Sequence, residues 1–425
     1  MLSHHAPNGG GNGAQREKEP SFLSPIYDQL ETNIPRGLMG FQDLNWPQDS
    51  QLFPKHTTVL QYIQDYGKEV EHLVQLSTQV INIEPEDTEY EGPWKVRTRD
   101  LPTNSQHEEV FDAVIVANGH FIVPYVPDIP GIKEWNKRYP GVISHAKYYR
   151  KANEFTGKKV IVVGNSASGS DISTQISQHC SLPLLWSSKS PSMLQTPTTA
   201  TKREMPPIAK FHISDRAVEF ADGTREQHID AIVFATGYFY SLPFLSKLSP
   251  KLIGDGSHVQ NTYQHLLYAP RPTLALLTLP QRIIPFPLSE SQAAVLARLY
   301  SGRLALPSLS TMQAWEQAVV DEMGAGRNFH LLPFPKDGNY INEMSRWAFT
   351  ATVKEGVQNE GKGKLPPIWG EWEFWCREKF PEIRRAFAAK GEERFGVRTL
   401  EEVGFSFDKY WKEKAGDSED KILKK

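Results

Sequence analysis

The feature that most constrains the fold of this chain is a glycine-rich stretch at residues 164–169. It follows the apolar, β-rich run 159–163 and precedes a helical stretch at 170–179, after which a second apolar run occupies residues 182–187. This order of strand, turn, helix and strand predicts a βαβ unit and therefore a parallel sheet. In such a unit, the turn at the amino end of the helix binds the pyrophosphate of a dinucleotide.

The residues of this turn suit close contact between the backbone and a phosphate. Gly164 permits the tight turn, the small Ser166 lets the backbone approach the pyrophosphate, and Gly169 allows helix and strand to pack closely. Ser166 stands where a glycine is usual, but its hydroxyl can donate a hydrogen bond to a phosphate. The candidate pyrophosphate-binding residues are Gly164, Asn165, Ser166, Ala167, Ser168 and Gly169. A glycine-rich turn with no ligand is the alternative.

The end of the second strand indicates which nicotinamide cofactor is bound. NAD-binding proteins place an acidic residue roughly 20 residues after the loop, where it hydrogen-bonds the ribose. Here the chain reads Ser187, Ser188 and Lys189, with no carboxylate to repel a 2′-phosphate. The lysine and the hydroxyls favour NADPH over NADH.

Length and composition set the outer limits. A chain of 425 residues exceeds what a single core usually supports, so we expect two domains. Its 47 Lys and Arg nearly balance 50 Asp and Glu, which argues against nucleic acid or an anionic membrane as a partner. The two cysteines, Cys180 and Cys376, lack metal-binding spacing, and no apolar run approaches transmembrane length. We therefore expect no metal site, no transmembrane segment and a cytoplasmic location.

Before the loop, the chain reads as a tail, a helix and several strands. Residues 1–20 are polar and rich in glycine, which predicts a disordered tail. An amphipathic helix is predicted from about Thr57 to Leu76, and strands at 79–83 and 94–99. The run 111–119 is apolar and ends in glycine, so it predicts a buried strand.

After the loop, a second copy of that pattern appears, followed by helices. The run 230–238 repeats the acidic residue, apolar strand and small-residue turn of 111–119, and the pair predicts two nucleotide-type sheets. Residues 124–135 are rich in proline and are predicted to be an extended connector without helix. The chain from about Gln292 onward has a helical pattern.

Several motifs occur in an order that resembles the flavin-containing monooxygenase family, in particular its fungal members. The identifying pattern of two aromatics, a glycine and a histidine is matched by Tyr139, Gly141, His145 and Tyr149. The resemblance extends from about Ser24 to Pro307. It implies that this segment joins a flavin domain to an NADPH domain, with His145 near the cofactors. A buried histidine with no chemical role is the alternative for His145.

The resemblance also supplies a candidate catalytic residue, Asn33. The stretch 24–35 is similar to the family's aromatic-rich segment that ends in Thr-Asn, whose asparagine lies beside the flavin ring. An amide there can hydrogen-bond the oxygenated flavin and NADP+ in a site without water. An Asx-type turn before Pro35 is the alternative.

Three further motifs complete the resemblance. Asn118 and Gly119, and likewise Thr236 and Gly237, are similar to the family's strand-end turns beneath the two cofactors. Gln292 matches the segment that re-enters the flavin domain. These five residues are therefore candidate ligands of FAD and NADPH.

One departure from the family concerns the ADP half of FAD. The family begins with a strand and a GxGxxG loop for that half, and neither precedes Ser24 in this sequence. An incomplete gene model, a protein completed by a second chain, and a remnant that binds NADPH alone all remain open. A flavin domain without this unit should expose an apolar edge and be marginally stable.

The predicted fold is α/β, with two Rossmann-like dinucleotide-binding domains of the three-layer β/β/α type and the NADPH domain inserted into a truncated FAD domain. The expected boundaries are 21–154 for the first part of the FAD domain, 155–268 for the NADPH domain and 269–425 for the second part of the FAD domain with carboxyl-terminal helices. The sequence leaves the oligomeric state open, a homo-oligomer included.

Two functions follow from these predictions. The first is an N,N-dimethylaniline monooxygenase-like enzyme that uses NADPH, FAD and O₂ to oxygenate a soft nitrogen or sulfur nucleophile through a flavin hydroperoxide. The second is a non-catalytic NADPH-binding remnant or subunit that cannot hold FAD alone.

Overall fold

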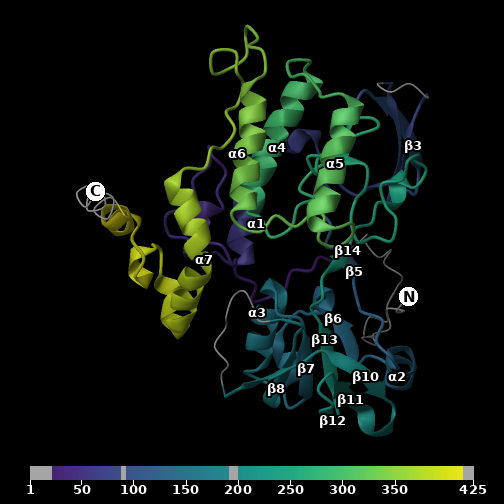
Figure 1. The fold of residues 1–425 in the computed structure, drawn as a ribbon, viewed down its shortest axis with the longest axis vertical. Helices are drawn as coiled ribbons and strands as arrows, with labels where there is room; N and C mark the ends of the chain where they lie inside the picture. Colours follow the sequence, from purple (N-terminus) through teal and green to yellow (C-terminus); the bar gives the residue numbers. More distant parts are fainter. Residues whose placement is uncertain (1–21, 88–91, 191–199, 415–425) are drawn as a thin grey trace.

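The computed structural model describes residues 22–87, 92–190 and 200–414, so the predicted tail at 1–20 lies outside the described residues. Figure 1 shows two parts: one contains strands β6–β8 and β10–β13, and the other carries the long helices α4, α5 and α6. We call them the loop domain and the helical half. The predicted mixed α/β architecture is confirmed.

The centre of the loop domain is a five-stranded parallel sheet in the order β6-β13-β7-β8-β9. Its strands are β6 (Ile143–His145), β13 (Ala231–Phe234), β7 (Lys159–Val163), β8 (Ser181–Ser187) and β9 (Lys202–Met205). Helix α3 (Ala167–Ile176) connects β7 to β8, which confirms the predicted βαβ unit. The prediction of strand 159–163 matches β7 residue for residue.

Alternating side chains of β7 build the layers on the two faces of this sheet. Val160 and Val162 face α3 and pack with Ile172 and Ile176. Ile161 faces the other side, in a core built with the antiparallel sheet β10 (Ile208–His212), β11 (Ala217–Phe220) and β12 (Arg225–Glu226). Because successive side chains of a strand point to opposite faces, one short apolar run supports both layers. The loop domain therefore has the predicted β/β/α layers.

The loop domain begins and ends earlier than the predicted range 155–268. Strand β6 lies before residue 155 but pairs with β13 in the parallel sheet. Short β5 (Val123–Pro124) pairs with β14 (Tyr238–Phe239), and Tyr240 already packs in the core of the helical half. A boundary drawn at the connector misses β6 because its short apolar run becomes a strand only beside β13.

The proline-rich stretch 124–135 is not extended throughout, which corrects the prediction. Helix α2 (Ile132–Arg138) begins within it, directly after Gly131 at a φ of 82°. Burial of Ile132 and Trp135 against the β10–β12 side of the loop domain stabilises this helix despite the preceding prolines.

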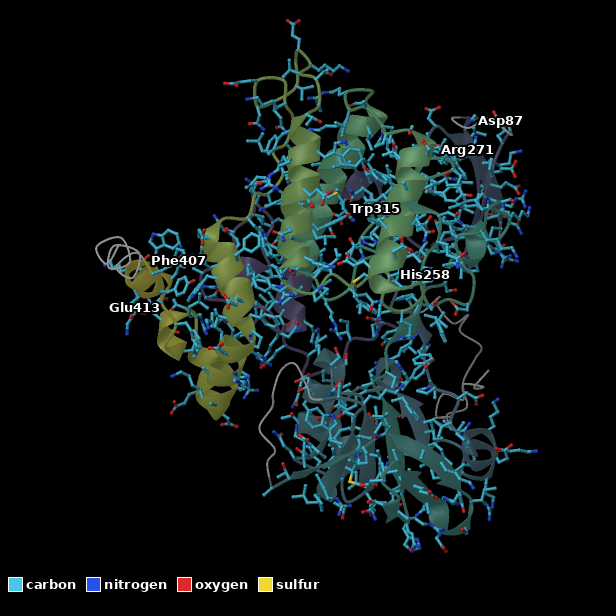
Figure 2. The ribbon with its side chains drawn as sticks, viewed as in Figure 1. Asp87, His258, Arg271, Trp315, Phe407 and Glu413 are labelled. Carbon is cyan, nitrogen blue, oxygen red and sulfur yellow. The ribbon has the colours of Figure 1, made fainter. Side chains whose placement is uncertain are left out.

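The strands of the helical half form two small sheets. Antiparallel β1 (Thr78–Pro85), β2 (Trp94–Asp100) and β3 (Gln106–Phe111) form one, and β15 (Thr262–Tyr263), β16 (Leu267–Tyr268), β17 (Leu274–Leu276) and β4 (Val114–Val116) form the other. Arg271 pairs with Asp87 at 3.1 Å beside the first sheet, where Figure 2 labels both residues.

Strand β4 is a half-covered edge, so the prediction of a buried strand is wrong at its centre. Among the described strands it pairs only with β17, in parallel and along one side, and Ile115 is 45% exposed although Val116 is buried. Composition alone cannot separate a central strand from an edge strand, because both require β-forming apolar residues. The expected exposed apolar edge is thus present at β4.

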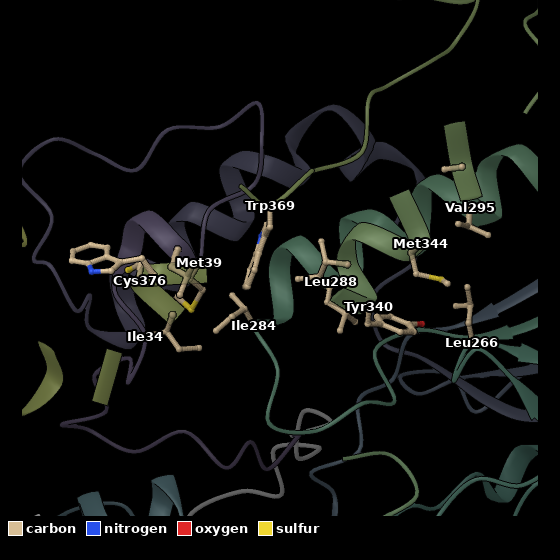
Figure 3. Packing of buried hydrophobic residues seen from close by; sticks show 14 of the residues in the cluster. Ile34, Met39, Leu266, Ile284, Leu288, Val295, Tyr340, Met344, Trp369 and Cys376 are labelled. Atoms are coloured by element: carbon tan, nitrogen blue, oxygen red, sulfur yellow. The ribbon is translucent and has the colours of Figure 1, made fainter. Parts of the chain in front are cut away.

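The helices described in this half are α1 (His56–Gly67), α4 (Pro285–Tyr300), α5 (Leu309–Met323), α6 (Lys336–Phe349) and α7 (Glu371–Ala389). Most helical residues of its largest core come from α4, α6 and α7. Figure 3 shows Leu288, Tyr340 and Met344 packed between α4 and α6. The predicted helix at 57–76 is found as α1 followed by a 3₁₀ turn over Lys68–Leu73, and the predicted helical pattern after Gln292 is confirmed.

Candidate functional site

The glycine-rich turn forms a cradle with no room for side chains at its two glycines. Gly164 has a φ of 110°, and a Cβ added to it would lie 2.4 Å from the carbonyl oxygen of Ala235. A Cβ at Gly169 would lie 2.1 Å from the carbonyl oxygen of Gly164. These contacts occur because β7 and β13 are paired and α3 begins immediately beyond the turn. The turn therefore brings three backbone segments together, as a pyrophosphate-binding turn requires.

The amino end of α3 is suited to an anion. Ser166 occupies the N-cap position in an extended conformation, and its side chain does not cap the helix. The N–H groups of a first helical turn have no partners within the helix, and the helix dipole adds partial positive charge there. The indole Nε1 of Trp186 donates to the carbonyl of Gly164 at 2.9 Å, and the Asn165 amide donates to the carbonyl of Ser190. The turn is thus braced from the neighbouring strand β8.

The residues expected to select the 2′-phosphate divide into two kinds. Ser187 is fully buried and its hydroxyl donates to the carbonyl of Pro206 at 2.8 Å, so it does not present a donor to a ligand. Ser188 is partly buried and Lys189 is exposed. The correction for Ser187 arises because strand side chains alternate, which turns the serine at the strand end inward. Lys189, being exposed, keeps its place as a candidate for the 2′-phosphate.

His145 supports the turn at the end of β13. Its Nε2 donates to the carbonyl of Gly237 at 3.0 Å and its Nδ1 accepts the N–H of Lys147 at 3.1 Å. Burial lowers the pKa of His145 to about 4, so the ring is neutral. With both nitrogens engaged, His145 is not placed to bind a cofactor as predicted. It positions Gly237 instead.

The Thr236–Gly237 turn is also reached from the helical half. The Thr236 hydroxyl donates to the carbonyl of Tyr125, while Gly237 has a φ of 86°. The Arg327 guanidinium stacks 4.1 Å from the Tyr125 ring centroid and donates to the carbonyl of Thr236 at 3.2 Å. Sequence reasoning missed Arg327, since no motif surrounds it and only tertiary packing brings it here.

Asn33 is partly buried, and within the described residues its side chain has no hydrogen-bond partner. The Asx-turn alternative is absent because Pro35 has no N–H to donate to the asparagine. Thr32 supports this bend instead, since its hydroxyl donates to the carbonyl of Ile34 at 2.9 Å. The Asn33 amide therefore keeps its hydrogen-bonding capacity for a ligand.

The end of β4 offers exposed backbone beside a buried imidazole. Asn118 and Gly119 are exposed, and Gly119 has a φ of 69° with open space where a Cβ would lie. The following His120 has a buried Nε2 that lacks a partner within the described part of the chain. These three residues line a cavity with Tyr240 and Leu277. The sequence motif placed Asn118 and Gly119 here but gave His120 no role.

Gln292 lies in the interior of α4 and serves the protein rather than a ligand. Its Oε1 accepts the N–H of Thr278 at 2.9 Å and its Nε2 donates to the Tyr340 hydroxyl at 2.8 Å. The side chain is fully buried. The prediction that Gln292 binds cofactor is corrected: this amide links α4 to α6.

Residues 22–87, 92–190 and 200–414 also bear on a metal site and on a membrane-spanning helix. No group of three or more His, Cys, Asp or Glu side chains in these ranges is arranged to hold a metal ion. No helix in the same ranges is long and apolar enough to cross a membrane.

The chain is similar in sequence to proteins of a known family. Residues 9–199 and 205–357 match the family described as flavin-binding monooxygenase-like. The chain is 33% identical to flavin-containing monooxygenase FMO GS-OX-like 2 of Arabidopsis thaliana, over 78% of this chain and 75% of that protein. It is 36% identical to FMO GS-OX1 of the same plant, over 68% of this chain and 63% of that protein. It is 27% identical to the ustF2 flavin-containing monooxygenase of Aspergillus flavus, over 84% of this chain and 78% of that protein.

Solved structures agree with these sequence relatives. S-allyl-L-cysteine S-oxygenase from Allium sativum superposes with a TM-score of 0.74 and 26% identity, over 96% of this chain and 87% of that one. Tmm from Pelagibacter sp. strain HTCC7211 superposes with a TM-score of 0.69 at 21% identity, over 86% and 77%, and supports the fold alone.

Proposed function

Because this chain belongs to the flavin-containing monooxygenase family, whose members are oxidoreductases that use FAD and NADPH, we propose that it is itself an NADPH- and FAD-dependent monooxygenase. In the overall reaction, NADPH supplies two electrons. One atom of O₂ is transferred to a soft nitrogen or sulfur nucleophile and the other leaves as water. The observation that carries the proposal is the cradle formed by Gly164, Gly169 and the uncapped start of α3.

The chain's own residues fit the NADPH. Backbone N–H groups at the start of α3 would bind the pyrophosphate, and the tight contact of Gly164 with Ala235 keeps that turn in shape. The exposed Lys189, assisted by Ser188, would pair with the 2′-phosphate. Gly237, held by His145 and overlain by Arg327, forms the neighbouring wall of the site.

The residues that fit a flavin lie at the end of β4. At the exposed Asn118–Gly119 turn the space beside the Gly119 Cα is open, so a ligand would meet backbone there, and the Nε2 of His120, which lacks a partner among the described residues, would offer a hydrogen bond beside it. FAD, when bound, supplies the chemistry that joins NADPH oxidation to O₂. The protein's part is to align the two cofactors and exclude water from the reacting atoms.

Asn33 is the proposed catalytic residue. Its amide has no partner within the described residues, so both its donor and its acceptor can serve a ligand. In a site without water, such an amide can hold NADP+ in place and stabilise developing negative charge.

Sulfur is our first choice of substrate atom. The solved relative covering most of this chain is named for S-oxygenation of S-allyl-L-cysteine, and we extend that chemistry to this chain as a proposal. Nitrogen nucleophiles remain the second choice. A cytoplasmic location is proposed because both cysteines, Cys180 and Cys376, are buried free thiols. A homo-oligomer is also proposed, since the half-covered β4 leaves an edge that a second chain can cover.

A second candidate function is NADPH binding without flavin chemistry. It is favoured by one observation, the half-covered edge at β4, where Ile115 is 45% exposed beside the proposed flavin site. An open edge there weakens the wall on which a flavin would rest.

Purified protein containing the 425 residues of this sequence distinguishes the two. After incubation with FAD and gel filtration, the first proposal expects flavin absorbance to remain with the protein, and NADPH-dependent O₂ uptake with a thioether substrate. The Asn33→Ala variant should lose at least about tenfold in product formation, whereas NADP+ binding, which the phosphate turn chiefly supplies, should weaken by less. Asn136→Ala on α2 is the matched control and should retain activity. NADP+ binding without flavin or O₂ uptake overturns the first proposal and supports the second.

A further inference from the structure

A hydrogen-bonded network connects the Asn33 segment to the helix that follows the phosphate turn. The Tyr27 hydroxyl donates to Asp171 Oδ2 at 2.5 Å. The Gln175 amide donates to the same oxygen at 2.9 Å and to the carbonyl of Gln29 at 3.3 Å. Tyr149 donates to Gln175 Oε1 at 2.9 Å. Tyr27 therefore meets the Asp171 carboxylate directly, and the Tyr149 segment joins the network through Gln175.

This network is inside the protein and not on its surface. Tyr27 is 5% exposed and Tyr149 is 3% exposed, and both belong to the core that includes Ile172 of α3. Burial raises the pKa of Asp171, whereas its hydrogen bond from Tyr27 and the charge of Arg384 lower it. No Lys, Arg or His within the described residues forms a direct ion pair with Asp171, so the two hydrogen-bond donors, together with the more distant charges of Arg384 and Lys202, compensate the buried carboxylate.

One end of the network is fixed to the phosphate turn. Asp171 is in the first turns of α3, four residues after Ala167, a rise of about 6 Å along the helix. The start of that helix cannot shift freely, because Gly169 packs against the carbonyl of Gly164 and Trp186 holds the same carbonyl. The position of Asp171 is thus set by the turn that we assign to the pyrophosphate.

The other end is fixed to Asn33. From Tyr27 the chain is held by the N–H of Asp28 on the carbonyl of Arg150 at 3.0 Å, and by the N–H of Thr32 on the carbonyl of Pro54 at 2.9 Å. Between them, Glu31 pairs with Arg384 and Arg394 at 3.1 and 3.4 Å. Asn33 lies directly after this braced stretch, so it has little freedom once Tyr27 is held.

We propose that Asp171 is a positioning residue that, through Tyr27, holds Asn33 at a set place relative to the phosphate turn. The inference rests on the proposed function in two respects, the assignment of the phosphate turn to the pyrophosphate and of Asn33 as the group that contacts the reacting atoms. Asp171 itself touches neither the dinucleotide nor the substrate. Its contribution is to keep two cofactor-facing elements of different domains in register, a requirement for alignment-dependent catalysis.

Hydrogen exchange and kinetics on the full-length protein test this directly. In Tyr27→Phe and Asp171→Leu, amide exchange in residues 26–33 should be at least about tenfold faster than in the wild type, with β7 unchanged. NADP+ should bind within about threefold of its wild-type affinity, because its own contacts remain. Product formed per NADPH should fall several-fold while KM for NADPH changes by less than about twofold.

Rescue and control variants separate positioning from general destabilisation. Asp171→Asn keeps an acceptor for the Tyr27 hydroxyl and should recover part of the exchange protection. The Tyr27→Phe and Asp171→Leu effects should not add, because both remove one interaction. Tyr268→Phe is the matched control: it loses a buried hydrogen bond to the carbonyl of Pro250, far from the segment, and should leave exchange at 26–33 unchanged.

The exchange result decides the proposal even if the proposed function fails. Unchanged protection of residues 26–33 in Tyr27→Phe overturns the inference whether or not the wild type oxygenates a substrate. Faster exchange with unaltered product per NADPH overturns it as well, since it would leave the network a purely structural contact. If the wild type itself does not oxygenate a substrate, the proposed function is rejected, and the exchange measurement can still be interpreted.

Discussion

Strand β7 of the loop domain and strand β4 of the helical half differ in the number of neighbouring strands and in the burial of their central side chains. In the loop domain, β7 has partners on both sides and its central Ile161 is fully buried. In the helical half, β4 has one partner and its central Ile115 is 45% exposed. Both strands end in a glycine turn that we assign to a cofactor. The comparison shows that one turn rests on a complete sheet and the other on a half-covered edge.

The largest effect is expected from the turn on the complete sheet. Gly169→Val should reduce NADP+ affinity by at least about a hundredfold, since its Cβ would lie 2.1 Å from a backbone oxygen and force the turn open. Calorimetric titration measures this. Gly67→Val is the control, because Gly67, like Gly169, is a helical glycine without a positive φ but has open space at the Cβ position. Equal losses in the two variants would mean that the lower helix propensity of valine, and not the cradle, governs binding.

Acid should affect the helical half more than the loop domain. Burial lowers the pKa of His120 to about 4 and that of His265 to about 3, and it lowers the pKa of His330 as well, whereas His145 is the one described histidine of the loop domain whose pKa is lowered. These rings are neutral when folded and take up protons on unfolding. The contribution of each buried histidine to the free energy of unfolding is therefore fully present above the unfolded-state pKa of about 6.5 and is lost as the pH falls toward 4. For a histidine whose folded-state pKa is about 4, the loss is about 3 kcal/mol.

Scanning calorimetry between pH 7 and pH 4, with and without NADP+, measures this difference. The helical half should unfold at lower temperature as the pH falls, and His265→Gln should flatten the dependence by removing one titrating group. The His265 ring faces His330 with the two Nδ1 atoms 3.0 Å apart, so the substitution also removes a neighbour of His330. A single transition that does not change with pH would contradict the assignment of the acid-labile region.

Truncation of the two central isoleucines compares the strands themselves. Ile161→Ala should destabilise the protein by about 3 kcal/mol, because it opens a cavity between two layers. Ile115→Ala should cost less than about 1 kcal/mol, since the side chain is already half in water. Denaturant unfolding of both variants is the measurement. A large loss for Ile115→Ala would show that the β4 edge is covered in solution, as a homo-oligomer would cover it.

The smallest effect concerns the choice between cofactors. Lys189→Ala should reduce the preference for NADP+ over NAD+ by about tenfold, the loss of one charge-assisted contact with the 2′-phosphate. Competition binding with both dinucleotides gives the ratio. Lys210→Ala is the matched charge-removal control, because Lys210 is an exposed lysine on β10. An unaltered ratio in Lys189→Ala would remove that residue from the site.

The sequence by itself determined the local units and the order of the motifs. The run 159–163, the turn at 164–169 and the following helix were readable because strand, tight turn and helix depend on neighbouring residues. The same holds for the helical pattern of the carboxyl-terminal part. It also identified the Asn33 and Asn118 segments by their resemblance to a family.

Only the tertiary structure decided which side chains face a ligand. The sequence predicted cofactor binding by Ser187, His145 and Gln292, yet the side chain of each forms hydrogen bonds to other residues of the protein. Arg327 and the Tyr27–Asp171 contact come from residues far apart in the chain. The physical reason is that a buried polar side chain must form hydrogen bonds with the groups around it. Which groups surround it depends on packing between segments that are distant in the sequence.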